Sequence, residues 1–311
     1  MKIVCMGDAL IDFKEQRPLN FQGFVGGSPL NVAVAAARLG EDVSFASQVS
    51  SDQFGKAIRN YLQANEVDTS YLLESDAPST LAFVGEVAGE AVFDFIANRS
   101  ADVLYNPEPR PSFPSSVRML QFGSISLLQE PAATTLTDIA ALHHERCTIV
   151  FDPNVRPTLI ASKGDYEARL RRDWLPISHI VKVSSQDLRW LYPERSLNEI
   201  AKDWLEHGPE VIIITQGENG VSLFRPQQPV LHVSVPAVDV VDTVGAGDTF
   251  TGALMVMLEE QAMAQPYHEI PETFWTSVLQ FAGYAAACNC TRAGANPPTR
   301  GELATFMRGN Q

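Results

Sequence analysis

Residues 242–248 combine two aspartates with a run of small residues just before an expected helix. The segment reads Asp242-Thr-Val-Gly-Ala-Gly-Asp248, and the amphipathic run 249–260 follows it. Backbone N–H groups at a helix N-terminus converge on an anion, and the helix dipole favours negative charge there. Asp248 could thus accept a proton from a hydroxyl nucleophile while nearby amides stabilise charge on a transferring phosphoryl group. The alternative is a tight turn followed by an acid that complements the helix dipole. The amides concerned belong to Gly245, Ala246 and Gly247.

A second group of polar residues lies near the N-terminus. Asp8 and Asp12 follow the first expected strand, and Gly26, Gly27 and Asn31 surround the start of an expected helix. Carboxylates, amides and a carboxamide in a rigid frame suit a polyol, since a sugar needs several directional donors and acceptors. Each residue also has a purely structural explanation, as a loop cap, a turn or a bond to the backbone.

The segment Asp152-Pro-Asn154-Val-Arg156 follows an expected buried strand over residues 148–151. This position is the carboxyl edge at which open α/β sheets bind their ligands. Arg156 is either a clamp for hydroxyl or carboxylate groups or one partner of a surface ion pair. Asn154 would lie beside it at the same edge.

A glycine-rich turn, Thr215-Gln-Gly217-Glu-Asn-Gly220, joins two expected strands. A nucleotide site and a plain hairpin explain it equally well. The chain contains no GxxxxGK[ST] loop, no GxGxxG after its first strand and no HExxH or GxSxG motif. P-loop enzymes, ordinary dinucleotide oxidoreductases and common hydrolases therefore lose support.

Composition narrows the partners further. The 311 residues include 23 Lys and Arg against 37 Asp and Glu, a formal net charge of -14. This balance argues against nucleic acid or an anionic membrane as a partner, and an anion such as ATP would need helix N-termini, glycine-rich loops and a divalent cation. The four cysteines lack CxxC spacing, and no long apolar segment is found, so a cytoplasmic protein without disulfides is expected.

Short apolar runs alternate with helical patterns almost from end to end. This alternation predicts a mainly parallel central sheet flanked by helices, in a single α/β domain over residues 1–311. Ser28 is expected to cap the helix that begins at Pro29. Strands are expected over residues 3–6, 43–49, 117–122, 148–151, 179–183, 211–215, 221–224 and 230–235. Helices are expected over residues 29–39, 54–65, 131–144, 197–207 and 249–260.

Two stretches interrupt that rhythm. Residues 79–97 predict two strands joined around Gly89, and residues 13–24 predict a further strand. Together they would form a small β-sheet lid beside the main sheet. The lid would need a ligand or a second copy of the chain to cover its apolar face, so a homodimer through the lid is expected. The apolar side chains concerned are Leu81, Phe83, Phe93 and Phe95.

Taken together, these motifs resemble the ribokinase, or PfkB, family of carbohydrate kinases over nearly the whole chain. The segment 242–248 resembles the family's C-terminal signature, residues 26–31 its N-terminal one, and residues 215–220 its nucleotide loop. The resemblance implies a ribokinase-like fold and ATP-dependent phosphorylation of a sugar hydroxyl, with Asp248 as the base. It also implies that Asp12, Gly27 and Asn31 hold the sugar. The nucleotide side would be lined by Thr215, Gly217, Gly220, Gly245 and Gly247.

Within the family, the segments 7–12, 122–127 and 152–156 look most like bacterial fructokinases. The resemblance therefore implies D-fructose as the acceptor, with 2-keto-3-deoxygluconate and other sugars or nucleosides as alternatives. A non-catalytic, sugar-binding regulatory protein on the same scaffold is the alternative from another class. Relatives often carry an arginine after the second lid strand, where this chain has Ala97, with Arg99 two residues later.

Two departures concern ions. The family's Asn-x-x-Glu motif, which organises Mg²⁺ and water, is replaced here by Ser184-Ser-Gln-Asp187. Asp187 could still reach Mg²⁺ through a water, because this ion retains several waters. Potassium activation is common in the family and would place a monovalent cation near Asp242, although Pro298 stands where a serine is frequent.

Overall fold

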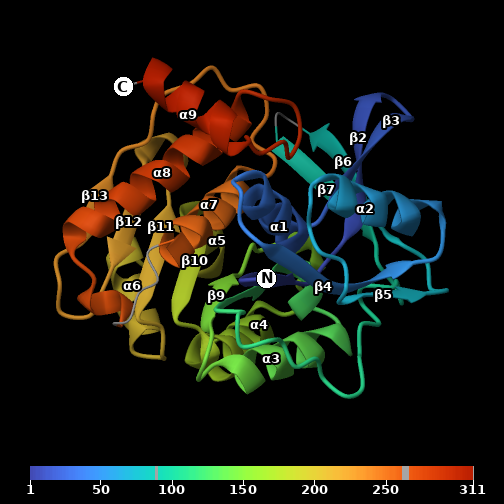
Figure 1. Ribbon diagram of the computed structural model, residues 1–311, viewed down its shortest axis with the longest axis horizontal. Coiled ribbons are helices and arrows are strands. Elements are labelled where there is room, and N and C mark those ends of the chain that lie inside the picture. Colours follow the sequence, from blue (N-terminus) through green and yellow to red (C-terminus); the bar gives the residue numbers. More distant parts are fainter. Residues whose placement is uncertain (88–89, 261–265, 311) are drawn as a thin grey trace.

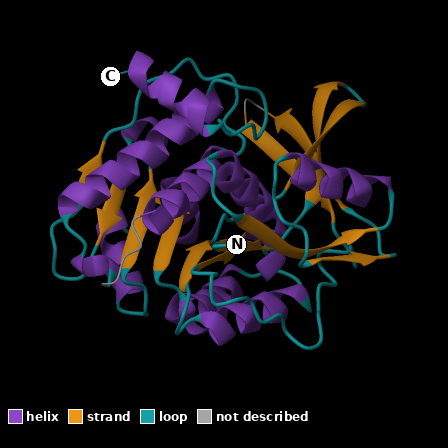
Figure 2. Ribbon diagram, viewed as in Figure 1, coloured by secondary structure: helices purple, strands orange, loops and turns teal. Residues whose placement is uncertain are grey.

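The computed structural model describes residues 1–87, 90–260 and 266–310, and it contains two separate sheets. A nine-stranded sheet crosses the centre of the molecule, and a four-stranded sheet stands at one side of it (Figure 1). Helices cover the large sheet on both faces (Figure 2). The predicted α/β class with a small β-lid is confirmed.

The large sheet has the strand order β13-β12-β11-β10-β9-β8-β1-β4-β5. All neighbouring strands from β5 to β11 run parallel, whereas β12 and β13 are antiparallel. Parallel neighbours end at the same edge, so the loops after β1, β8, β9 and β10 meet there. The strands are β1 (Ile3–Met6), β4 (Val43–Ser50), β5 (Leu72–Ser75), β8 (Met119–Gly123), β9 (Thr148–Asp152), β10 (Ile180–Ser184), β11 (Val211–Thr215), β12 (Val221–Phe224) and β13 (Leu231–Val233).

Two apolar cores lie on the two faces of this sheet. One packs α1, α7 and α8 against it, and the other packs α3, α4 and α6. The helix over residues 272–290 was not predicted, because it is apolar around most of its circumference and shows no clear stripe. The helices are α1 (Ser28–Arg38), α2 (Gln53–Ala64), α3 (Ala132–His143), α4 (Lys163–Arg169), α5 (Ser185–Leu191), α6 (Leu197–Leu205), α7 (Ala246–Glu260), α8 (Glu272–Cys290) and α9 (Arg300–Gly309).

The lid is the four-stranded sheet, with the order β3-β2-β6-β7. Its strands are β2 (Leu10–Arg17), β3 (Asn20–Gly26), β6 (Thr80–Val87) and β7 (Glu90–Ile96). The single strand predicted over residues 13–24 is wrong, because the chain reverses at Leu19, whose φ is 60°, and forms a hairpin instead. Phe13 stacks on Phe83 at 5.3 Å and meets Phe54 of α2 edge-on. The turn around Gly89 and the side chain of Phe93 lie outside the described residues.

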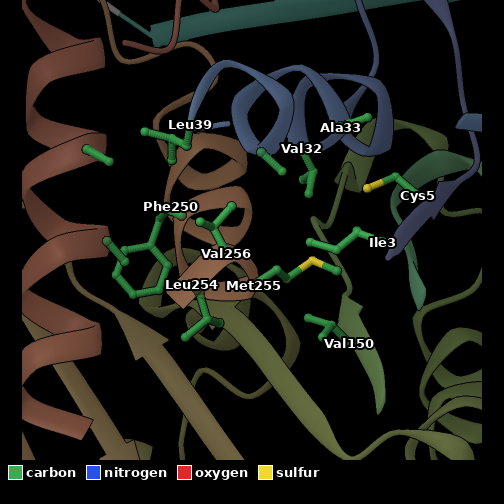
Figure 3. Close-up of a cluster of buried hydrophobic side chains, with 14 of the residues drawn as sticks. Ile3, Cys5, Val32, Ala33, Leu39, Val150, Phe250, Leu254, Met255 and Val256 are labelled. Atoms are coloured by element: carbon green, nitrogen blue, oxygen red, sulfur yellow. The ribbon is translucent and has the colours of Figure 1, made fainter. Parts of the chain in front are cut away.

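Helices α1 and α7 approach each other closely within the first core (Figure 3). A Cβ atom at Gly252 would lie 2.8 Å from the Ala35 Cβ and 2.9 Å from the Val32 carbonyl oxygen. Only a glycine therefore allows this contact without movement. Because Gly252 lies one turn beyond Asp248, the contact also brings the N-termini of the two helices together.

No helix in the described part of the chain is both long enough and apolar enough to span a membrane. The four cysteines are free thiols, of which Cys5, Cys147 and Cys288 are buried. Burial raises the pKa of each of these three thiols. Cys5, Cys147 and Cys288 therefore act as small apolar core residues.

Candidate active site

Asp248 is a buried carboxylate in the first turn of α7, held from α1. Its Oδ1 accepts a hydrogen bond from Ser28 Oγ at 2.7 Å, and its Oδ2 accepts one from Asn31 Nδ2 at 2.8 Å. Burial raises the pKa of Asp248, while the bonds from Asn31 and Ser28 and the charge of Lys182 oppose that rise. The carboxylate is thus fixed in orientation and kept more basic than an exposed aspartate.

The start of α1 explains how both partners reach Asp248. The N-cap is Gly27, with φ 114°, and no side chain caps the helix. The prediction that Ser28 caps α1 is therefore wrong, because its hydroxyl is used on Asp248. Asn31, predicted to contact a sugar, is also placed on Asp248. A side chain at position 27 would collide with the Asp8 carbonyl oxygen.

The residues before Asp248 form the predicted turn into the helix. Gly245 has φ 73°, and a Cβ atom there would lie 2.6 Å from the Ala295 Cβ. The Ala246 amide donates to the Thr243 carbonyl at 3.2 Å and would have to leave it to bind an anion. Within the described residues, the structure gives no acceptor to the amides of Gly245, Gly247 and Asp248. This helix N-terminus can therefore receive a negatively charged group.

Asp12 of the lid strand β2 and Arg156 after β9 lie close enough for their charges to interact. Burial raises the pKa of Asp12 to about 6, the charge of Arg156 lowers it and that of Asp248 raises it again. Asp12 lies over Gly26, where any side chain would collide with its Oδ2. Arg156 Nη1 donates to Asn154 Oδ1 at 2.6 Å, and Asn154 adopts φ 39°. These groups offer a polyol both acceptors and donors.

A cavity of about 500 Å³ lies between the lid hairpin β2–β3 and the loops before α7 and α9. It connects Asp12 to the segment that leads into Asp248. Such a cavity has the size of a small-molecule site. Its lining includes Asp12, Lys14, Arg17, Phe24, Asp242 and Val244.

Asp8 lies at the end of β1, is almost fully buried, and is part of the same carboxylate-rich floor. It accepts hydrogen bonds from the Ser28 amide at 3.0 Å and from Ser126 Oγ at 3.2 Å. Burial, with the charges of Asp102 and Asp248, raises the pKa of Asp8 to about 7. The carboxylate thus ties β1 to α1 and to the turn after β8.

Lys182 is a site residue that the sequence reasoning missed. Its Nζ lies 2.8 Å from Asp152 Oδ2, and both side chains are buried. Burial lowers the pKa of Lys182, but the charges of Asp152, Asp248 and Asp187 together raise it. The available signal was a lysine inside the apolar strand residues of β10, since a lysine is almost never buried without a partner.

Asp242 pairs with Lys14 of the lid strand β2, at 2.7 Å. It also accepts hydrogen bonds from the amides of Val244 and Gly294, at 3.1 and 3.0 Å. Burial raises the pKa of Asp242, but these bonds and the Lys14 charge outweigh burial and lower it. The lid is thereby linked directly to the loop that enters α7.

The predicted nucleotide residues lie along the same edge of the sheet, farther from the lid. Thr215 ends β11, and Gly217 and Gly220 adopt φ values of 59° and 86° in the turn to β12. Ser184 Oγ accepts the Asp187 amide at 3.0 Å and so caps α5. Burial raises the pKa of Asp187, and the charge of Asp152 adds to the rise.

One predicted ligand, Arg99, is less closely connected to this floor. Arg99 is exposed and has φ 54°, and the structure gives it no hydrogen bond or ion pair among the described residues. Ala97, two residues before it, is buried.

Across residues 1–87, 90–260 and 266–310, no three His, Cys, Asp or Glu side chains gather to hold a metal ion.

Comparison with known sequences places this geometry in context. The model of the pfkB family of carbohydrate kinases matches residues 1–300. Fructokinase from Rhizobium leguminosarum bv. trifolii is 35% identical over 263 residues, covering 83% of this chain and 79% of its own. Fructokinase from Salmonella typhimurium is 33% identical, covering 84% of this chain and 86% of its own.

Solved structures are similar over almost the whole chain. ATP-bound fructokinase from Xylella fastidiosa has a TM-score of 0.89 at 27% identity, covering 99% of this chain and 98% of its own. Aminoimidazole riboside kinase from Salmonella enterica, complexed with aminoimidazole riboside and an ATP analogue, has a TM-score of 0.86 at 26% identity. The match covers 99% of this chain and 100% of that one. A double mutant of Vibrio cholerae fructokinase with fructose, ADP and potassium bound has a TM-score of 0.85 at 26% identity. The match covers 100% of this chain and 98% of that one.

Proposed function

The chain belongs to the pfkB family of carbohydrate kinases, and on that premise we propose that it transfers the γ-phosphoryl group of ATP to a hydroxyl of D-fructose. The arrangement around Asp248 carries this proposal. A buried carboxylate, oriented by Ser28 and Asn31, stands beside three amides with no acceptor in the described chain. A base and an anion site in one helical turn are what phosphoryl transfer to a hydroxyl requires.

The sugar would lie between Asp12, Arg156 and the helix N-terminus. Asp12 and Arg156 would bind its hydroxyls and orient a primary hydroxyl toward Asp248. Asp248 accepts that hydroxyl's proton as the oxygen attacks the γ-phosphorus, and the bond from the γ-phosphorus to the bridging oxygen breaks so that ADP leaves. The amides of Gly245 and Gly247, with that of Ala246 once it leaves Thr243, would stabilise charge on the transferring group. The lid, already linked through Lys14 to Asp242, would exclude water.

The nucleotide would lie along the second half of the edge, near Ser184, Thr215, Gly217 and Gly220. Mg²⁺ is the divalent cation we propose, with Asp187 as its protein contact through water. Mg²⁺ can be bound by one protein carboxylate together with the substrate phosphates. The half-buried Asp187 at the start of α5 could be that carboxylate. When bound, Mg²⁺ neutralises phosphate charge.

We also propose a monovalent cation near Asp242, the carboxylate that Lys14 now neutralises. The potassium-bound Vibrio cholerae fructokinase variant supports this assignment. Lys14 and the cation would compete for the same carboxylate, so a monovalent ion should matter less while this ion pair persists.

Apolar side chains of the lid support a homodimer of this single-domain enzyme. Phe21 and Phe83 meet edge-on at 5.3 Å on the face that carries Phe13, and Ile96, opposite Leu81 on that face, is 59% exposed. An apolar face of this kind is commonly covered by a second copy. Gel filtration at micromolar concentration should give a dimer, and a clean monomer would contradict it.

Four free thiols and a requirement for ATP support a cytoplasmic location.

A coupled ADP-release assay on the full chain tests the proposed activity. The acceptors are fructose, 2-keto-3-deoxygluconate, ribose, adenosine and aminoimidazole riboside, each with Mg²⁺ and ATP. Fructose should give the highest kcat/KM. A higher value for another acceptor would replace fructose with that substrate. Sugar binding without ADP release would instead favour a regulatory protein.

A further inference from the structure

Lys182 is a buried lysine that has no role in the reaction as proposed above. Its side chain is 5% exposed and that of its partner Asp152 is 1% exposed. A lysine placed so deep costs free energy unless its charge is compensated, and a paired charge is often no more stabilising than apolar residues. The pair Lys182–Asp152 therefore calls for a reason beyond stability.

The position of the ammonium supplies that reason. A Cβ atom at Gly247 would lie only 2.8 Å from Lys182 Nζ, so the ammonium lies directly against the first turn of α7. A helix N-terminus already bears partial positive charge. A cation beside it is unfavourable in an empty site and favourable once an anion arrives. Asp152 is the one hydrogen-bond partner of the Lys182 ammonium among the described residues.

We propose that Lys182 is a positioning residue for phosphoryl transfer: held on Asp152 beneath Gly247, its ammonium keeps Asp248 charged and adds fixed positive charge to the anion site. This inference rests on the proposed function, because it requires Asp248 to be the base. Lys182 acts through Asp248 and the helix N-terminus. It is not assigned a contact with substrate.

The charges around Asp248 fix the sign of the effect. Asp8 at the end of β1, Asp12 in the lid and Asp152 in β9 oppose its ionisation, whereas Lys182 in β10 favours it. Its neutral partners, Ser28 and Asn31, come from α1 and also favour the charged form. Asp152 also holds the segment leading to Arg156, since its Oδ1 accepts the Asn154 amide at 3.1 Å. Lys182 thus connects the base to the sugar-binding loop.

Two substitutions should move the pH dependence in opposite directions. Lys182→Met removes the favourable charge, so the acid limb of kcat at saturating fructose and ATP should rise by about one pH unit. Asp152→Asn removes an opposing charge and leaves Lys182 to act on Asp248, so the same limb should fall. Lys202→Met, an exposed lysine of α6, serves as the control and should leave the limb unchanged.

Circular dichroism and gel filtration first establish that each variant is folded. Opposed shifts support the inference; limbs that stay at the wild-type pH, or that move in the same direction, overturn it. If Lys182→Met does not fold, the acid limb of Asp152→Asn decides alone. A limb that does not move to lower pH in that variant then overturns the inference. Absence of ADP release by the wild-type chain would instead contradict the proposed function.

Discussion

The floor of the site and the lid above it are built differently. The floor groups Asp248, Asp8 and Lys182 come from α7 and the carboxyl edge of the main sheet, and they are buried and hydrogen-bonded. The lid offers Asp12 and Lys14, which are partly exposed. On the proposed function, the chemistry would depend on the buried, hydrogen-bonded floor, and sugar selection on the less buried side chains of the lid.

The largest effect is expected on the floor. Asp248→Asn keeps the shape of the side chain but cannot accept the proton, so kcat should fall by about 10²–10⁴-fold. Folding and ATP binding should be preserved. Steady-state ADP release and thermal unfolding with and without ATP measure both. Near-normal turnover in a folded variant would remove Asp248 from the role of base.

Asp8 should make the floor sensitive to pH. Its folded pKa of about 7 is raised, so the folded state binds a proton that the unfolded state has already lost. Wild-type stability contributed by this group therefore falls as pH rises from about 4 to 7. Asp8→Asn abolishes that loss, so its stability relative to wild type should improve by about 2–3 kcal/mol between pH 5 and 8.

Denaturant unfolding at pH 5, 6, 7 and 8 checks this prediction. Asp52→Asn is the matched control, because Asp52 caps α2 and has a lowered pKa. Its carboxylate is ionised in both states above pH 5, so the difference from wild type should stay flat. A flat difference for Asp8→Asn would show that Asp8 does not titrate in this range.

Asp12 tests the sugar side of the lid. Asp12→Asn removes one charged acceptor for a sugar hydroxyl, and kcat/KM for the sugar should fall roughly tenfold, mainly through KM. Kinetics at several fructose concentrations separate KM from kcat. Asp94→Asn, at an exposed position on the lid strand β7, should leave both constants unchanged. Equal losses in the two variants would point to a general disturbance of the lid.

The smallest effect concerns Lys14. Lys14→Met frees Asp242, so activation by K⁺ should increase about two- to fivefold relative to wild type. This is a gain of less than 1 kcal/mol, as expected for an ion pair whose lysine side chain is 45% exposed. Activity measured across KCl concentrations at constant ionic strength tests this. Lys56→Met on α2 controls for lost surface charge. No change in potassium response would remove Asp242 from the proposed cation site.

Sequence reasoning reached the fold because alternating strands and helices leave periodic patterns. It failed at α8, which is apolar on most sides, and at the hairpin over residues 10–26, where Leu19 takes a conformation unusual for its type. The sequence could propose the motif residues Asp248, Asp12 and Arg156 because their types and positions suggest chemistry, and their roles stay predictions. Lys182 and the bond from Ser28 depend on distant strands and helices meeting, which local patterns do not reveal.

The most direct test of the central claim is product formation by the full chain with ATP, Mg²⁺ and fructose. Mass spectrometry and coupled ADP detection would be followed in the same reaction. Wild type should form one fructose phosphate for each ADP, and Asp248→Asn should form almost none. Fructose that stabilises the protein against unfolding while neither product forms would contradict it.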